Sequence, residues 1–165
     1  MRRWKLSKKD RKRLIETILS KWPNAPISNN DDIEVVSDKR EGVEELYLIN
    51  GKPAFVKIGD KLVPLLNYLL EAGVEWLPRI IVDEGAVRPI TRGANLLRPG
   101  IVAFEGDFRR GDIVVILEPL KRIPIAVHEA VVDRGEAESM EKGVVAKKLH
   151  YMGDRLWKYA RKLGS

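Results

Sequence analysis

The stretch Val82–Ile101 limits the possible fold of this chain more than any other. It reads Val-Asp-Glu-Gly-Ala-Val-Arg-Pro-Ile-Thr-Arg-Gly-Ala-Asn-Leu-Leu-Arg-Pro-Gly-Ile, with glycine and proline where a strand, a short helix and a tight loop need them. Asp83 and Glu84 stand where acids favour a helix N-terminus, and Gly93 follows Arg92 where a helix would end in a left-handed residue. The stretch therefore predicts a docking surface, not a catalytic pocket.

Length and charge narrow the class of protein. The 165 residues can form one medium domain or two small ones, and two small ones fit better. Charged residues make up 33% of the chain and the formal net charge is +6, so we expect attraction to polyanions such as nucleic acid or an anionic membrane surface. No stretch approaches the ~20 apolar residues of a membrane span, and the basic N-terminus runs into an amphipathic pattern. We therefore expect a soluble, cytoplasmic protein.

The first part of the chain predicts an α+β unit over residues 1–76. Apolar residues at helical spacing predict a helix from Ser7 to Trp22, with Ser7 and Asp10 as a capping box and Pro23 as its end. Asn50-Gly51 is a strong hairpin signal, because both residues accept positive φ. The expected strands are Ile33–Ser37, Val43–Ile49 and Ala54–Ile58, and a second helix is expected over Leu62–Ala72 with Gly73 as its C-cap.

The second part, residues 77–165, predicts a small β-barrel or sandwich. Short β-branched runs with frequent turn signals are typical of such folds. The expected strands are Trp76–Val82, Asp112–Glu118, Ile123–Val132 and Val144–Tyr151, with a short helical or turn segment over Glu136–Lys142.

A cluster of hydrogen-bonding residues surrounds Gly93. Arginine's planar fork suits phosphate oxygens and guanine edges, and a glycine loop lets a sugar-phosphate backbone approach closely. Spacing alone equally allows a structural helix end with solvated arginines. The residues concerned are Arg88, Thr91, Arg92, Asn95 and Arg98.

The order of small and acidic residues resembles the pattern of the PUA domain, a compact RNA-binding barrel. The matching positions are Asp83, Gly85-Ala86, Gly93-Ala94, Leu96, Pro99-Gly100-Ile101, Gly111-Asp112 and Gly153-Asp154. The resemblance implies an RNA-binding face formed by Arg88, Thr91, Arg92, Gly93, Ala94, Asn95 and Leu96, with Arg98 nearby and Lys147 and Lys148 in the last strand. The chain departs from the pattern at His128, which follows Ala126-Val127 where the family usually has glycine.

The ending from Gly143 to Trp157, together with the preceding α+β unit, is similar to one subgroup of PUA proteins. It resembles archaeal relatives of the malignant-T-cell-amplified-sequence proteins. That resemblance implies a role in translation initiation on the small ribosomal subunit, beside a partner with an initiation-factor-like domain.

Signals for catalysis are weak. The chain has no cysteine, which excludes disulfides, thiolate catalysis and cysteine-ligated zinc, and is compatible with a thermophilic source. His128 and His150 show no metal-ligand spacing, and the pairs Asp31-Asp32 and Glu44-Glu45 would point to opposite faces of a strand. Nucleotide-binding loops and serine-nucleophile motifs are missing from the sequence. We predict no catalytic residue, metal or cofactor.

Some features allow more than one interpretation. The basic residues between Arg2 and Arg13 favour a solvated helix face, with a second RNA contact or a membrane-surface helix as alternatives. Tyr151, Trp157 and Tyr159 favour closing a core over stacking on bases. The leading hypothesis is a non-catalytic protein that binds structured RNA, either transfer or ribosomal RNA. The alternatives are an RNA-modification enzyme or its accessory subunit, and a protein-interaction adaptor.

Overall fold

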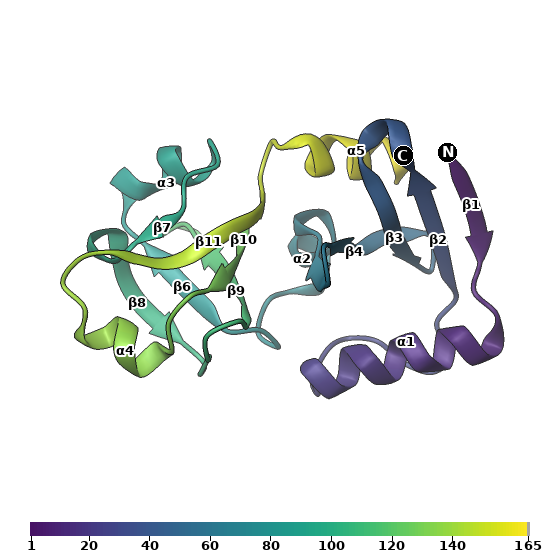
Figure 1. Ribbon diagram of the computed structural model, residues 1–165, viewed down its shortest axis with the longest axis horizontal. Coiled ribbons are helices and arrows are strands. Elements are labelled where there is room, and N and C mark those ends of the chain that lie inside the picture. The colour runs from purple at the N-terminus through teal and green to yellow at the C-terminus, as the bar shows by residue number, and fades with distance from the viewer. Residues whose placement is uncertain (165) are drawn as a thin grey trace.

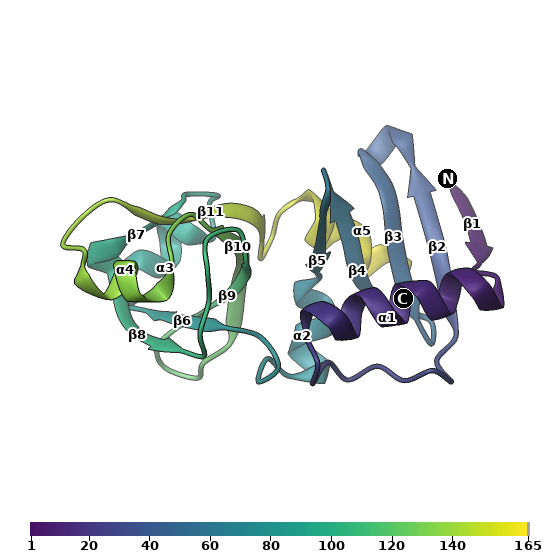
Figure 2. The ribbon, with the colours of Figure 1, turned by 60° about the horizontal axis from the view of Figure 1, so that its bottom comes forward.

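The computed structural model describes residues 1–164 and shows two sheets joined side by side (Figure 1). The first is antiparallel in the order β1-β2-β3-β4-β5, formed by β1 (Arg2–Lys5), β2 (Ile33–Asp38), β3 (Val43–Ile49), β4 (Lys52–Ile58) and β5 (Lys61–Pro64). Helix α1 (Lys8–Lys21) lies along one face of this sheet, and α2 (Leu66–Ala72) and α5 (Arg155–Leu163) lie on the other side (Figures 1 and 2). A short 3-10 helix, η1 (Lys39–Glu41), joins β2 to β3.

Local signals explain the first unit. The Ser7 side chain accepts a hydrogen bond from the Asp10 N–H at 3.1 Å, and Ile15, Ile18 and Trp22 bury the apolar stripe of α1, which confirms the predicted helix. Asn50 and Gly51 both adopt positive φ, at 51° and 81°, in the turn between β3 and β4, as predicted.

The segment Leu62–Ala72 was predicted as one helix, and its first part is wrong. Residues Lys61–Pro64 form β5, because Leu62 and Val63 are buried and pair with β4. Helix α2 begins only at Leu66 and ends at Gly73, whose φ of +85° confirms the expected C-cap. Strand β1 was not predicted, since all four of its residues are exposed and show no apolar alternation.

The second sheet curls into a half-barrel in the order β7-β11-β10-β9-β6-β8, which confirms the predicted α+β fold with a C-terminal PUA-type barrel. Strands β6 and β9 are parallel, and the other neighbours are antiparallel. Ile80, Val114, Ile116 and Val145 lie in its core. The elements are β6 (Arg79–Val82), α3 (Glu84–Ile90), β7 (Leu96–Leu97), η2 (Arg98–Gly100), β8 (Ile101–Glu105), β9 (Ile113–Leu117), β10 (Pro124–Ala130), α4 (Arg134–Ser139) and β11 (Val144–Tyr151).

Helix α5 crosses back to the first sheet. Its Ala160 is buried in the core of the first unit, the Tyr159 hydroxyl donates to Asp38 at 2.9 Å, and Arg155 pairs with Glu41 at 3.2 Å. The division into residues 1–76 and 77–165 remains a proposal, but residues 155–163 pack with the first unit.

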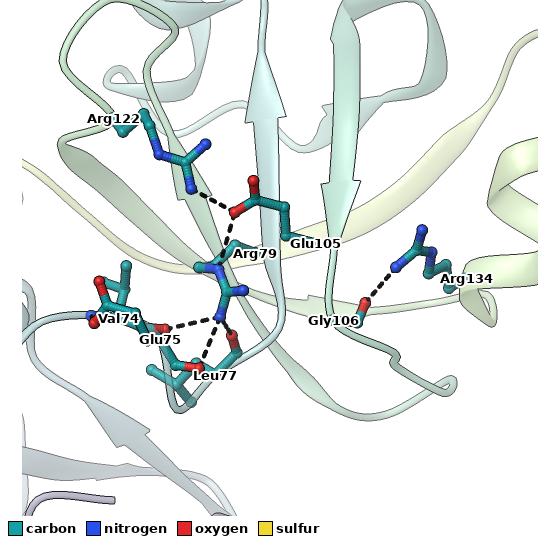
Figure 3. Close-up of polar contacts among 8 residues, drawn as sticks. All are labelled: Val74, Glu75, Leu77, Arg79, Glu105, Gly106, Arg122 and Arg134. Carbon is teal, nitrogen blue, oxygen red and sulfur yellow. Dashed lines mark hydrogen bonds and ion pairs between the residues drawn. The ribbon is translucent and has the colours of Figure 1, made fainter. Parts of the chain in front are cut away.

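The linker between the sheets is held by one arginine. Arg79 Nη1 donates to the carbonyl oxygens of Val74 at 3.2 Å and Glu75 at 2.9 Å, and also to that of Leu77 (Figure 3). Its Nε donates to Glu105 at 3.2 Å, which also pairs with Arg122 (Figure 3). These hydrogen bonds from Arg122 and Arg79 lower the pKa of Glu105. The charged contacts fix the direction in which the chain enters the half-barrel.

Candidate nucleic-acid interface

Helix α3 and the turn after it form the base of the candidate interface. Asp83 caps the helix by accepting from the Ala86 N–H at 2.9 Å. At the other end the Thr91 hydroxyl donates to the Val87 carbonyl at 3.0 Å, and Gly93 takes a φ of +94°. The short helix and the glycine loop expected from the sequence are therefore present.

The loop rests directly against strand β11. A Cβ atom placed on Gly93 would lie 3.1 Å from Lys148 Nζ and 3.1 Å from Tyr151 Cε1, a separation tighter than most side-chain contacts. Asn95 Oδ1 accepts a hydrogen bond from the Lys148 N–H at 3.0 Å, and Lys148 Nζ lies 5.4 Å from the centre of the Tyr151 ring. Glycine is thus required here both for its backbone conformation and for the close approach of two elements.

Three predicted cations are exposed at this loop. Arg88 comes from the last turn of α3, Arg92 from the turn that follows, and Lys148 from β11. None of the three forms an ion pair within residues 1–164. Ala94 and Asn95 are exposed beside them. The result is a small surface of free positive charge around an accessible stretch of backbone, hereafter the loop face.

The other predicted residues are buried, bonded within the fold or turned away from the loop face. Leu96, predicted on the RNA-binding face, is instead buried in the half-barrel core, where its apolar side chain packs. Arg98 Nε donates to the Ala137 carbonyl at 2.7 Å and its guanidinium lies over Phe104, so its charge is already engaged. Lys147 pairs in register with Glu129, and adjacent strand residues point to opposite faces, so Lys147 faces away from Lys148. The structure therefore gathers Arg88, Arg92 and Lys148, but not Arg98 or Lys147.

A hollow of about 320 Å³ adjoins the loop face. Pro89, Ile90 and Leu97 supply apolar lining, and the backbone around Gly85 and Gly100 completes its wall. Sequence reasoning did not find this hollow, because it forms only when the segment after α3 folds back beneath the helix. It also did not place Tyr151 at the loop face, although that residue was considered for base stacking.

His128 lies buried near the same strand. It is in β10, where a bulge separates its pairing with Lys148 from that of Val127, and its side chain is fully buried. Burial lowers the pKa of His128 to about 4, with an opposing contribution from the Ala146 backbone and a further lowering by Lys148. Neither ring nitrogen has a hydrogen-bond partner of good geometry within residues 1–164.

His150 has defined polar partners. Its Nε2 accepts from the Leu66 N–H at 3.1 Å, and its Nδ1 meets Asp154 Oδ2 at 2.9 Å. Hydrogen bonding to His150 and to backbone N–H groups keeps the pKa of Asp154 low, although burial is the largest single influence and opposes this. In residues 1–164 no group of His, Asp or Glu side chains could hold a metal ion, and no helix of that part could cross a membrane.

Known families match both units. The PUA domain matches residues 78–152, and the Domain of unknown function (DUF1947) matches residues 2–72. A protein of Methanocaldococcus jannaschii is 30% identical over 171 residues, which cover 96% of each chain. Translation machinery-associated protein 20 of Saccharomyces cerevisiae is 31% identical over 81% of this chain and 76% of its own.

Solved structures show the same arrangement. A PUA domain protein from Aeropyrum pernix K1, in complex with tartrate, has a TM-score of 0.91 and 32% identity, covering 99% of this chain and 93% of that one. A conserved PUA domain protein from Thermoplasma acidophilum has a TM-score of 0.79 and 31% identity, covering 96% and 99%. The chain therefore belongs to the family of PUA-domain proteins with this N-terminal domain, which includes Translation machinery-associated protein 20.

Proposed function

We propose that this protein is a non-catalytic RNA-binding protein that recognises structured RNA, either transfer or ribosomal RNA, in translation initiation or ribosome function. The observation that carries the proposal is the loop face, where Arg88, Arg92 and Lys148 surround the loop at Gly93 without ion-pair partners in residues 1–164.

The chemistry of the loop face suits the end of an RNA stem. A-form RNA presents its backbone and 2′-hydroxyls on a wide minor groove, while its narrow major groove hides the bases. Guanidinium groups at Arg88 and Arg92 can bind phosphate oxygens in pairs, and the ammonium of Lys148 adds a point charge. The neighbouring apolar hollow of about 320 Å³ has room for an unpaired base at the stem end.

The proposed setting in translation rests on the relatives. Translation machinery-associated protein 20 matches this chain across both units, so its name bears on the whole fold. The small ribosomal subunit and an initiation-factor-like protein are the partners we propose, in the cytoplasm.

The relatives also support the proposal that the protein is not catalytic. A probable tRNA pseudouridine synthase B of Pyrobaculum calidifontis is 44% identical, but over 71 residues that cover 43% of this chain and only 21% of that enzyme. The similarity is thus limited to a part of the enzyme, and the rest of that enzyme has no counterpart in the match.

The test is crosslinking in native lysate, followed by sequencing of the RNA bound to wild type and to Arg88→Ala/Arg92→Ala. Enrichment of transfer or small-subunit ribosomal RNA that disappears in this variant is expected. The control is Lys8→Ala/Lys12→Ala, which removes two exposed cations of α1 and should leave the enrichment unchanged. No enrichment, or enrichment that both variants retain, would favour the adaptor hypothesis and contradict the proposal.

A further inference from the structure

A basic hollow lies on helix α5, apart from α3 and the glycine loop. It has a volume of about 790 Å³ and opens between α5 and the connection from β2 to β3. Its wall is formed by Asp38, Glu41, Arg155, Lys158, Tyr159, Arg161 and Lys162. None of the large apolar side chains exposed on residues 1–164 lines it.

Both carboxylates in this hollow already have partners. Asp38 accepts from the Tyr159 hydroxyl at 2.9 Å, and Glu41 pairs with Arg155 at 3.2 Å. Burial and Asp38 raise the pKa of Tyr159 to about 12, so the phenol keeps its proton at neutral pH. The negative charge is thus internally compensated.

Two cations of the same hollow have no such compensation. Lys158 and Arg161 are exposed, lie one helical turn apart on α5, and form no ion pair or side-chain hydrogen bond within residues 1–164. An adjoining hollow of about 360 Å³ shares Asp38 and is lined by Arg2, Lys39 and Arg40, which extends the positive surface.

The placement of α5 relates this surface to the loop face. In Figure 1, α3 and α5 lie along the upper side of the molecule, and β11 crosses the middle of the half-barrel and leads up to α5, whereas α1 and α4 lie along the lower side. Figure 2 agrees, since α1 and α4 come forward when the bottom of the molecule is turned toward the viewer. Strand β11 leads from Lys148 through one turn into α5, which limits the distance from Lys148 to Arg161 to roughly 30 Å by strand and helix rises.

We propose that the hollow on α5 is a second phosphate-binding surface, and that one RNA stem lies across both units from the loop face to α5. This inference rests on the proposed function and names its ligand more closely, as a continuous duplex and not an isolated loop. An RNA duplex fits this hollow because Lys158 and Arg161 leave positive charge there without a carboxylate partner in residues 1–164, and phosphate oxygens would supply the missing negative charge. Lysine is depleted at the centre of protein interfaces, which disfavours a protein partner.

The proposal is tested by direct binding. The probe is a hairpin RNA with a stem of about 16 base pairs, the length that a double-stranded RNA-binding domain spans. Wild type is compared with Lys158→Ala/Arg161→Ala, with the control Lys8→Ala/Lys12→Ala, which removes the same charge from the opposite side, and with Arg88→Ala/Arg92→Ala. Circular dichroism melting establishes that each variant is folded.

The α5 variant should bind the hairpin roughly tenfold or more weakly at about 0.1 M salt, because each lost phosphate contact forfeits counterion release. Its slope of log affinity against log salt should be shallower by about 1.4 to 1.8, the contribution of two contacts. The α1 control should retain wild-type affinity and slope. A hairpin of about four base pairs, too short to reach both surfaces, should not distinguish the α5 variant from wild type.

The results separate this inference from the proposed function. If wild type binds and Arg88→Ala/Arg92→Ala does not, but the α5 variant equals wild type, the second surface is refuted and the proposed function stands. If the α5 and α1 variants lose affinity equally, general charge explains the effect and the second surface is also refuted. If wild type binds none of the hairpins or transfer RNA transcripts, the proposed function fails and the inference fails with it.

Discussion

His128 should make the stability of the protein depend on pH in a range where carboxylates contribute little. Its side chain is fully buried, and its pKa is about 4 in the folded protein against an ordinary value of 6.5. The unfolded chain therefore takes up a proton more readily than the folded one. The free energy of unfolding is unaffected above pH 6.5, falls as the pH drops from 6.5 to about 4, and loses nothing further from His128 below that.

The size of the effect follows from the two pKa values. At about 1.36 kcal/mol per pKa unit, the whole change amounts to about 3 kcal/mol, of which about 2 kcal/mol is lost by pH 5. The replacement His128→Leu removes the titrating group and both unpartnered ring nitrogens while nearly keeping the volume. At pH 7 its stability should be close to that of wild type or higher, because an unpaired buried polar group is lost.

The assay is urea unfolding of wild type and His128→Leu at several values between pH 7.5 and 5, which are chosen around the two pKa values. Between pH 7.5 and 5, the free energy of unfolding of wild type should fall by about 2 kcal/mol more than that of His128→Leu. Effects of all other titrating groups are common to both proteins and cancel. If the free energies of unfolding of the two proteins changed in parallel with pH, His128 would titrate at its ordinary pKa. That result would refute the conclusion that burial lowers its pKa.

Three other predictions concern the linker and the loop face. Arg79→Lys should lower stability by about 2–4 kcal/mol in urea unfolding, because one ammonium cannot reach all the linker carbonyls. Arg122→Ala removes only an exposed ion pair and should cost much less, so equal effects of the two variants would contradict the role of Arg79 in holding the linker. Gly93→Ala should be more destabilising than Gly153→Ala by about 1 kcal/mol and should alone weaken RNA binding. The two glycines have φ of +94° and +91°, but only Gly93 has neighbours within 4 Å, so equal thermal and binding shifts would refute the close approach. Wild-type affinity for the hairpin should fall with a log–log salt slope of about −3.5 to −4.5 for five phosphate contacts, and a nearly flat response in a salt titration would contradict electrostatic binding.

Elements with strong local signals could be predicted from the sequence. Helix α1 has a capping residue, a complete apolar stripe and a terminating proline, and the turn at Asn50-Gly51 needs only residues that accept positive φ. Strand β11 matches its predicted range Val144–Tyr151 fully. Segments without such signals were missed: β1 has no buried residue, and β5 is a short apolar run that periodicity cannot separate from a helix.

For the candidate site too, locally determined features could be predicted, whereas features set by strand register and packing could not. The cap at Asp83 and the left-handed Gly93 are local features, so the helix and loop that carry Arg88 and Arg92 were predicted. Which lysine of β11 faces the loop depends on strand register, and a bulge near His128 shifts that register in a way that the sequence does not display. Arg98 was included for its charge, whereas its carbonyl and ring contacts come from α4 and β8, elements brought together only by the fold.

The junction between the units determines whether two separate basic surfaces can serve one ligand. The Leu66 N–H of the first unit donates to His150 of β11, and His150 in turn meets Asp154, which caps α5. This chain of hydrogen bonds passes through a fully buried histidine, so it cannot be exchanged for water without opening the core. Lys148 precedes these residues along the chain and Lys158 follows them, so the junction limits how far the backbone positions of the two lysines can move relative to each other. A stem that fits this spacing avoids the ordering cost that two flexibly linked units would incur, so the same junction that stabilises the fold would also favour a rigid duplex over an unpaired strand.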